Sequence, residues 1–340
     1  MRWLARIAGD ETVPLSVLRV VAALLTFGLA LGTAIARAEK APHREIVQKG
    51  CATGAVCVGP NGAYASLAAA LSAAKPGQVV EIETGRYRES VRIAVPGLTV
   101  RGLEKGAHID CAGIALVRKE ACLLIAAPGI VLENLEISGA VLSAADDANG
   151  ACIRNEHGAS FTLRKIVCHS SQDGLLASGG EVIIESSEFY DNGWDGLTHN
   201  VYLGDCSKVT VRDSVFRDAR VGHEFKSRCR KTAIYDSVFV ARHGSRALDL
   251  PDGGDVIVEG GTIFQGEAVQ NENLIGYAAE SCKYPGGMIL RGVHIVSRNP
   301  NGSIRNYGRC SGAVITLIGV TYEGPPLHLI GEIRTLPLPR

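Results

Sequence analysis

The apolar positions of this chain recur in short stretches rich in β-branched residues, in which apolar and polar residues alternate. Alternation with a period of two is typical of half-buried strands. From residue 130 onward, a unit of one strand, a polar corner and a second strand recurs at a period near two dozen residues. The copies are residues 130–137, 161–167, 182–189, 209–216, 233–239, 256–263 and 288–295. A constant period of this kind indicates a repeat architecture.

The repeated unit is too short to hold a helix, but it suits a coil of two or three short strands joined by turns. Stacked coils form parallel sheets in which each coil lies ~4.8 Å above the last. The sequence therefore predicts an all-β fold, a right-handed parallel β-helix, in which residues one period apart are neighbours. A sandwich or barrel is the competing fold, but it lacks a constant period and uses antiparallel hairpins, whose Asn-Gly signal does not recur between paired strands here.

A helix is predicted ahead of the first strands. Residues 64–75 are strong helix formers and end at Pro76 and Gly77, after which strands alternate over residues 78–102. This order resembles the N-terminal cap of pectate-lyase-like β-helix proteins. The resemblance implies that the helix covers the open end of the strand stack.

The first 38 residues have the pattern of a secretory signal peptide. Three arginines precede an apolar run over residues 20–35, and the small-x-small sequence Ala36, Arg37, Ala38 follows. An uncleaved membrane anchor is the alternative, because the run is near the lower limit of ~17 residues for a spanning helix. We expect a signal peptide (1–38), an N-terminal extension (39–63), a β-helix domain (64–325) and a C-terminal tail (326–340), with the protein in the periplasm or secreted and no stable membrane span after cleavage.

Ten cysteines follow the predicted cleavage point. An even number in an oxidising compartment predicts disulfides, and none has the doubled C-x-x-C spacing of a zinc site. Neighbours along the sequence suggest the pairs Cys51 with Cys57, Cys111 with Cys122, Cys152 with Cys168, Cys206 with Cys229, and Cys282 with Cys310. Cys206 and Cys229 are separated by about one coil, which favours that pair.

The charge balance of the chain limits the kinds of binding partner that we expect. With 35 basic and 35 acidic residues the chain has no net field to attract a polyanion, so we expect no nucleic-acid partner. A local basic cleft remains compatible with this balance, and residues 226–231 are the place to look for it. A monomer is expected, without a cofactor; calcium stays open, although no dense Asp cluster with calcium-loop spacing is present.

Polar and ionisable residues concentrate in three stretches, 191–205, 217–231 and 242–254, which the repeat places on adjacent coils. Side chains alternate between the interior and the outer face of a strand. With Phe225 inside, Glu224, Lys226 and Arg228 share the outer face. Leu248 and Leu250 inside leave Asp249 beside that group, and Arg246 joins it if a bend intervenes. Strict alternation carries His199 inward with Val201 and Leu203 unless the chain turns at Asn200.

These residue types suit β-elimination on a uronic acid polymer. That reaction needs a cation beside the carboxylate, a base for the C5 proton and an acid for the leaving oxygen. We predict Lys226 as the base, because a neighbouring Arg disfavours its charged form, Arg228 as the carboxylate neutraliser, and His199 or His223 as an assistant in proton transfer. The residues predicted to bind the acidic polysaccharide are Asp195, Asn200, Tyr202, Glu224, Arg246 and Asp249.

The stretches HNVYLG, GHEFKSR, LDLPDGG and NENLIGY resemble a group of proteobacterial right-handed β-helix proteins. Over roughly residues 60–325 the chain is similar to pectate-lyase-like polysaccharide lyases, including alginate and chondroitin lyases that use Lys and Arg on the outer face. The resemblance implies an exported carbohydrate-active enzyme, a polysaccharide lyase, although no complete catalytic signature of one family is present.

Other functions and simpler roles stay open. An inverting glycoside hydrolase needs two carboxyl groups ~6.5 to 9.5 Å apart; a uronan epimerase shares the proton abstraction; and a non-catalytic glycan-binding or cell-surface protein would use the same groove. Lys226 and Arg228 are alternatively ordinary exposed cations, and His223 a buried, hydrogen-bonded histidine. The acids available for hydrolysis are Asp173, Asp195, Asp249 and Asp252, of which Asp173 and Asp195 precede Gly and are alternatively turn formers.

Overall fold

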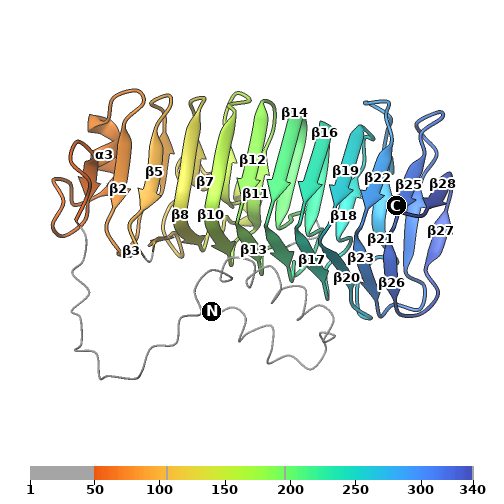
Figure 1. Cartoon of the computed structure of the whole chain (residues 1–340). Helices are drawn as coiled ribbons and strands as arrows, with labels where there is room; N and C mark the ends of the chain where they lie inside the picture. Colours follow the sequence, from red (N-terminus) through yellow and green to blue (C-terminus); the bar gives the residue numbers. More distant parts are fainter. Residues whose placement is uncertain (1–49, 105, 195–196, 339–340) are drawn as a thin grey trace, which may run out of the picture. The chain divides into compact units, whose positions relative to one another are not determined.

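The computed structural model describes residues 50–104, 106–194 and 197–338, and these residues form a right-handed parallel β-helix (Figure 1). Every pairing between its named strands is parallel, and partners lie about one coil apart in the sequence. The predicted fold class is confirmed. Each coil contributes strands to three outer faces, which we call the first, second and third face.

The first face contains the first strand of each repeat. Its members are β1 (Val56–Val58), β2 (Val79–Ile82), β5 (Thr99–Gly102), β8 (Ile130–Ser138), β10 (Phe161–His169), β12 (Glu181–Glu185), β14 (Val201–Arg212), β16 (Phe225–Tyr235), β19 (Asp255–Glu259), β22 (Met288–Arg291), β25 (Ile315–Ile318) and β28 (Ile333–Leu336).

The second and third faces follow. The second holds β3 (Gly85–Tyr87), β6 (Ala107–Asp110), β13 (Glu188–Tyr190), β15 (Val215–Arg217), β17 (Val238–Ala241), β20 (Thr262–Gln265), β23 (His294–Ser297) and β26 (Thr321–Glu323), together with the ends of β8 and β10. The third holds β4 (Val91–Ile93), β7 (Ala121–Ile125), β9 (Ala151–Asn155), β11 (Asp173–Ala177), β18 (Leu248–Leu250), β21 (Asn273–Tyr277), β24 (Ser303–Asn306) and β27 (His328–Ile330), together with the starts of β14 and β16.

One residue in the left-handed region turns the chain from the first face to the second in successive coils. The residues are Asn134, Lys165, Ser186, Asp213 and Asp236, with φ between 45° and 55°. In three coils a serine comes next, and its hydroxyl accepts a backbone N–H from the coil before, as Ser214 Oγ does from Ser187 N at 3.1 Å. Asp and Ser favour such local hydrogen bonds, which explains why the repeat carries a polar corner.

The core is a continuous column of apolar side chains along the helix axis. On the first face the column is Val80, Val100, Leu132, Leu163, Ile184, Val211, Ile234, Val258, Leu290 and Leu317, each in register with the next and each at most 4% exposed. On the second face Phe189, Phe216 and Phe239 stack with ring centroids 5.6 and 5.0 Å apart. Burying these rings fixes the register of the middle coils.

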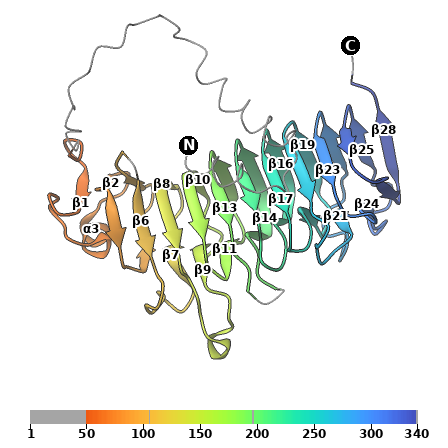
Figure 2. The ribbon, with the colours of Figure 1, turned by 90° about the horizontal axis from the view of Figure 1, so that it is seen from below.

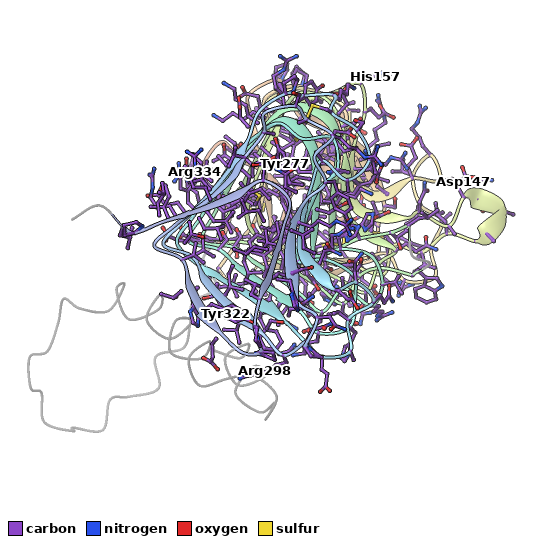
Figure 3. All side chains as sticks on the ribbon, turned by 90° about the vertical axis from the view of Figure 1, so that its right-hand side faces the viewer. Asp147, His157, Tyr277, Arg298, Tyr322 and Arg334 are labelled. Carbon is purple, nitrogen blue, oxygen red and sulfur yellow. A yellow bond between two sulfur atoms is a disulfide. The ribbon has the colours of Figure 1, made fainter. Side chains whose placement is uncertain are left out.

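The predicted helix is α3 (Leu67–Ala73), and it packs at the N-terminal end of the stack (Figure 1). Ser66 caps it, accepting a hydrogen bond from Ala69 N at 3.2 Å. Leu67, Ala70 and Leu71 are buried in the same core as the strands. A short 3₁₀ helix, η1 (Ala144–Asp146), lies in a loop that projects from the stack near Asp147 (Figures 2 and 3).

The stack is longer than the predicted domain of residues 64–325. At one end β1, which lies in the predicted N-terminal extension, pairs with β2 of the predicted domain. At the other end β27 and β28, which lie in the predicted C-terminal tail, pair with β24 and β25 of the predicted domain. The predicted signal peptide lies outside the described residues, among which no helix is long and apolar enough to cross a membrane.

All five predicted disulfides are present: Cys51 with Cys57, Cys111 with Cys122, Cys152 with Cys168, Cys206 with Cys229, and Cys282 with Cys310. Cys206 and Cys229 are also register partners between β14 and β16, as the repeat period predicts.

Candidate active site on the third face

Polar side chains from three successive coils meet on the outer side of the third face. Tyr202 in β14 is the register partner of Lys226 in β16, which is the partner of Asp249 in β18. Lys226 Nζ lies 3.7 Å from Asp249 Oδ2. The predicted neighbourhood of Lys226 and Asp249 is therefore present. We define the third-face cluster as His199, Tyr202, His223, Lys226, Arg228, Arg246, Asp249, Asp252 and Glu280.

Arg246 joins this cluster because the chain bends before β18. Its guanidinium donates to Asp249 Oδ1 at 2.7 Å and to Tyr307 Oη at 2.7 Å. Asp249 is thereby almost completely covered, with 1% of its side chain exposed. Burial raises the pKa of Asp249, while Arg246 and Lys226 act in the opposite direction.

Arg228 connects four elements of the site. Its Nε donates to Tyr202 Oη at 3.0 Å, and its terminal nitrogens donate to Asp252 Oδ1 at 2.8 Å and to Glu280 Oε2 at 2.5 Å. Burial alone would lower the pKa of Arg228, but the bonds to Glu280, Tyr202 and Asp252 raise it above its ordinary value. Arg228 is therefore a fixed cation.

Glu280 is a member of the site that the sequence did not single out. It lies in the loop between β21 and β22, half exposed, and its carboxylate contacts both Arg228 and Lys226 Nζ, the latter at 3.2 Å. Burial opposes ionisation, yet Arg228 and Lys226 hold the pKa of Glu280 below its ordinary value. The repeat period gave no signal for it, because Glu280 is 54 residues from Lys226 and outside any strand.

His199 and His223 form a ladder with the backbone. Asp173 Oδ1 accepts the N–H of His199 at 2.8 Å, His199 Nδ1 accepts the N–H of His223 at 3.0 Å, and His223 Nδ1 accepts the N–H of Arg246 at 3.1 Å. The two rings stack with centroids 4.9 Å apart. Because each Nδ1 is an acceptor, the proton of each neutral ring is assigned to Nε2.

Both imidazoles are neutral at ordinary pH. Burial, together with His223 and Lys226, lowers the pKa of His199 to about 2. Burial, together with Lys226 and Arg246, lowers the pKa of His223 to about 3. A ring whose Nδ1 is occupied and whose Nε2 carries the proton donates hydrogen bonds rather than accepting protons. His223 Nε2 lies 3.4 Å from Asp249 Oδ2 and faces it in this way.

Two predicted binding residues lie inside the stack instead of on its outer face. Asn200 and Glu224 are both 0% exposed. Glu224 accepts hydrogen bonds from Asn200 Nδ2 and from the N–H of Ala219, and burial raises its pKa well above the ordinary value. The prediction that Glu224 shares the outer face with Lys226 is wrong, because β16 begins only at Phe225 and alternation does not extend across the bend before it.

The remaining acidic candidates differ in accessibility. Asp195 lies outside the described residues. Asp173 is 2% exposed, and burial raises its pKa to about 7. It starts the histidine ladder and does not reach the outer surface.

Trp194 is 49% exposed, with Arg220 5.9 Å from its ring centroid.

Comparison with known proteins supports the fold. No family model matches the sequence, and no curated protein does. Among solved structures, pectin methylesterase PemA from Erwinia chrysanthemi is 13% identical over 84% of this chain and 93% of its own, with a TM-score of 0.51. A mutant pectin methylesterase in complex with a hexasaccharide is 14% identical over the same shares, also with a TM-score of 0.51. The chain thus has the pectin-lyase-like right-handed β-helix fold, as the resemblance implied.

Proposed function

We propose that the protein is an exported polysaccharide lyase that cleaves a uronate-containing glycan by β-elimination on the third face. The observation that carries this proposal is the convergence of two cations, Lys226 and Arg228, on the single carboxylate of Glu280.

Glu280 marks a place on the surface that is built for a carboxylate. Its side chain is 50% exposed, so solvent reaches the point where the ammonium and the guanidinium meet. A uronate carboxylate has the same charge and the same paired acceptor oxygens, and a guanidinium binds such oxygens in a fixed geometry. We infer that the substrate carboxylate takes the place of Glu280, which moves with its loop. Neutralising that carboxylate makes the C5 proton of the sugar easier to remove.

Tyr202 is the group best placed to remove the C5 proton. Tyr202 is the register partner of Lys226 on the outer side of the third face, and Arg228 Nε donates to its oxygen at 3.0 Å, so this oxygen is held beside the two cations proposed to bind the substrate carboxylate. Lys226 fits this role less well than the sequence predicted, because its amino group already contacts two carboxylates, Asp249 at 3.7 Å and Glu280 at 3.2 Å.

The third-face cluster supplies a base for the C5 proton and an acid for the leaving oxygen. Tyr202 first gives its hydroxyl proton to solvent and then takes the C5 proton; the electron pair of the C5–H bond forms the C4–C5 double bond, and the C4–O4 bond breaks. The Lys226 ammonium, in the next coil, gives a proton to the departing oxygen. Asp249 keeps Lys226 in position, and Arg246 with His223 in turn keeps Asp249 in position.

Hydrolysis by paired carboxylates fits this arrangement less well. Asp249 is occupied by Arg246, Lys226 and His223, and Asp252 accepts hydrogen bonds from Arg228 at 2.8 Å and Ser281 at 2.9 Å. A nucleophilic or proton-donating carboxylate must face the substrate. The carboxylates of the third-face cluster instead face cations of the protein.

The export part of the proposal rests on the five disulfides, which persist in an oxidising compartment such as the periplasm or the outside of the cell. The substrate class that we propose is an acidic polysaccharide; the two similar structures are pectin methylesterases, one of them in complex with a hexasaccharide.

The test is a panel of uronate polymers, with and without chelator, in which ultraviolet absorbance follows the conjugated double bond. We expect absorbance to grow on at least one polymer, and Tyr202→Phe to reduce the rate by about 100-fold or more with an unchanged thermal transition. Tyr235→Phe, on the outer side of the first face, is the matched control and should retain activity.

Other products would overturn the proposal. New reducing ends without absorbance indicate a hydrolase, released methanol an esterase, and inversion at C5 without cleavage an epimerase. Binding without any product indicates a glycan-binding protein, and full activity in Tyr202→Phe removes the assigned base.

A further inference from the structure

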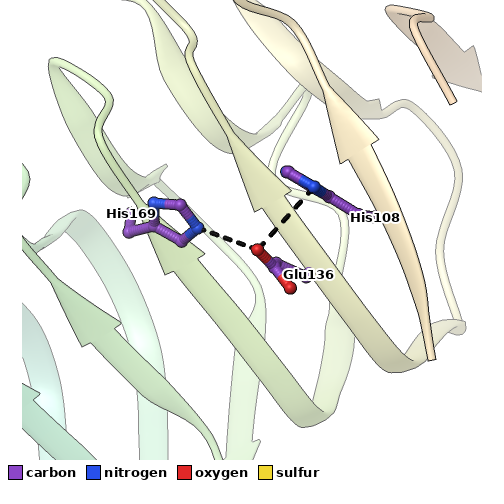
Figure 4. A group of neighbouring side chains, drawn as sticks. All are labelled: His108, Glu136 and His169. Carbon is purple, nitrogen blue, oxygen red and sulfur yellow. Dashed lines mark hydrogen bonds and ion pairs between the residues drawn. The ribbon is translucent and has the colours of Figure 1, made fainter. Parts of the chain in front are cut away.

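A second cluster of ligating side chains lies on the second face, separate from the third-face cluster. His108 in β6, Glu136 in β8 and His169 in β10 come from three successive coils and point toward one another (Figure 4). Glu136 Oε1 lies 3.7 Å from His108 Nδ1 and 3.1 Å from His169 Nε2. One ligand atom from each residue lies within 4.8 Å of the other two.

The ring nitrogens that face away from Glu136 each have a serine partner. His108 Nε2 is 2.8 Å from Ser138 Oγ, and His169 Nδ1 is 3.0 Å from Ser170 Oγ. When these nitrogens donate to the hydroxyls, the lone pairs of His108 Nδ1 and His169 Nε2 point toward Glu136. Metal-binding histidines are held in this way, with the second nitrogen donating to an outer partner.

From this geometry we propose that His108, Glu136 and His169 bind one divalent transition-metal cation, for which Zn²⁺ is the probe. Two imidazole nitrogens and one carboxylate oxygen are ligands that suit Zn²⁺ and its neighbours rather than Ca²⁺ or Mg²⁺, which prefer oxygen alone. Ligands at ~2.0 to 2.1 Å in a tetrahedron are roughly 3.3 Å apart. The separations of 3.7 and 3.1 Å from Glu136 are close to this value, and the two histidine nitrogens, which lie within 4.8 Å of each other, would approach by up to ~1.5 Å on binding.

A simple hydrogen-bonded ladder explains the cluster less completely. The 3.7 Å between Glu136 and His108 is too long for a hydrogen bond, so Glu136 alone does not account for the orientation of His108.

The proposed site has an open position and a structural consequence. Glu136 is 47% exposed and the histidines are 23% and 17% exposed, so a cation can enter from solvent and keep a bound water as its fourth ligand. Because the ligands come from three coils, the cation would clamp those coils together and stabilise the folded chain. Its loss would leave the third-face cluster unaffected.

The test is calorimetric titration of the untagged, chelator-treated full chain with ZnCl₂. We expect saturable binding of one Zn²⁺, a Zn²⁺-dependent rise in Tm, and no such rise with Ca²⁺. His169→Gln should abolish binding, and Glu136→Gln, at an exposed position, should weaken it at least 10-fold while the metal-free Tm stays within a degree or two. His157→Gln, whose ring is 86% exposed and outside the cluster, is the control and should bind as the native chain does.

Absence of saturable Zn²⁺ binding would overturn the proposal. Equal affinity in the native chain, His169→Gln and Glu136→Gln would also overturn it, because the metal would then be bound elsewhere.

Discussion

At the scale of single residues, the site is organised by side chains that accept backbone hydrogen bonds from the next coil. Asp173, His199 and His223 accept the backbone N–H groups of His199, His223 and Arg246, respectively, each of which lies in the next coil just before a strand. Such bonds fix the ring planes and the tautomer of both histidines at once. The histidines therefore shape the site as neutral donors.

This neutrality predicts a pH dependence of stability. The pKa of His223 is about 3 in the folded chain and ~6.5 when unfolded. Between these pH values the unfolded chain binds a proton at His223 that the folded chain does not. The contribution of neutral His223 to the free energy of unfolding is therefore fully present above pH ~6.5 and is lost as the pH falls toward 3. His223→Asn keeps an acceptor for Arg246 N but cannot titrate. Between pH ~7 and ~4.5, the free energy of unfolding of this variant should fall by about 2 kcal/mol less than that of the native chain, as measured by denaturant unfolding.

His157→Asn is the control, because that ring is exposed, and it should follow the native pH profile. The raised pKa of Asp173 has the opposite effect on the profile, but it is present in all three chains and cancels in the comparison. If the free energy of unfolding depended on pH in the same way in His223→Asn and in the native chain, protonation of His223 would not destabilise the folded chain, and the prediction would be wrong.

Side-chain alternation predicted the positions only of those members of the third-face cluster that lie within strands, because alternation holds only there. Lys226 and Asp249 lie within strands, and their meeting on one face followed from alternation and the period. Asn200 and Glu224 precede strands, where the chain bends and alternation gives the wrong side. Glu280 lies in a loop whose path no repeat specifies, so its contact with Arg228 needed the three-dimensional structure.

At the scale of elements, the bend before β16 decides whether the histidines stack. Gly222 has φ of 70° in this bend, and a Cβ there would lie 2.0 Å from Thr198 O and 2.5 Å from His199 Nδ1. Neither atom can yield freely, because one is backbone and the other is hydrogen-bonded to His223. Only glycine fits this position.

Gly222→Ala should therefore disturb the ladder as well as strain the backbone. Gly292 offers a matched control, since its φ is 60° and nothing lies within 4 Å of an added Cβ. We expect Gly292→Ala to cost about 1 kcal/mol of folding free energy and to keep activity. Gly222→Ala should cost about 2 kcal/mol more and lose lyase activity, as measured by urea unfolding and the absorbance assay. Equal costs would mean that the bend tolerates the methyl group.

The elements themselves were largely readable from the sequence. The seven repeats fall on the corner between the first and second faces, and the helix lies where strong helix formers precede Pro76. These elements are specified by local features of the sequence. The repeats show apolar periodicity and have one left-handed corner residue per coil. The position of the bends before β14, β16 and β18 is set by contacts between coils, and no local pattern specifies it.

At the scale of the whole β-helix, each coil is stabilised mainly by the coils on either side of it, so the two ends are the exposed parts. Helix α3 covers the N-terminal end with Leu67, Ala70 and Leu71. At the other end β27 and β28 form the last coil, with Leu329, Ile330 and Leu336 each more than a third exposed. The domain predicted from the sequence ends at residue 325, so these strands lie in the predicted C-terminal tail.

Removing this last coil tests whether it is part of the folded domain or a tail. It covers Ile304 and Ile315, which are 0% exposed, and Leu317, which is 4% exposed. Deleting residues 327–340 would bring these side chains to an open end of the stack, which costs several kcal/mol and should lower Tm by at least about 4 °C. Deleting residues 337–340 leaves β27 and β28 intact and serves as the control. We expect the longer deletion to increase binding of a dye specific for apolar surface, while the control does not. An unchanged Tm after the longer deletion would mean that β24 and β25 already close the core, and that the boundary near residue 325 describes the stable domain.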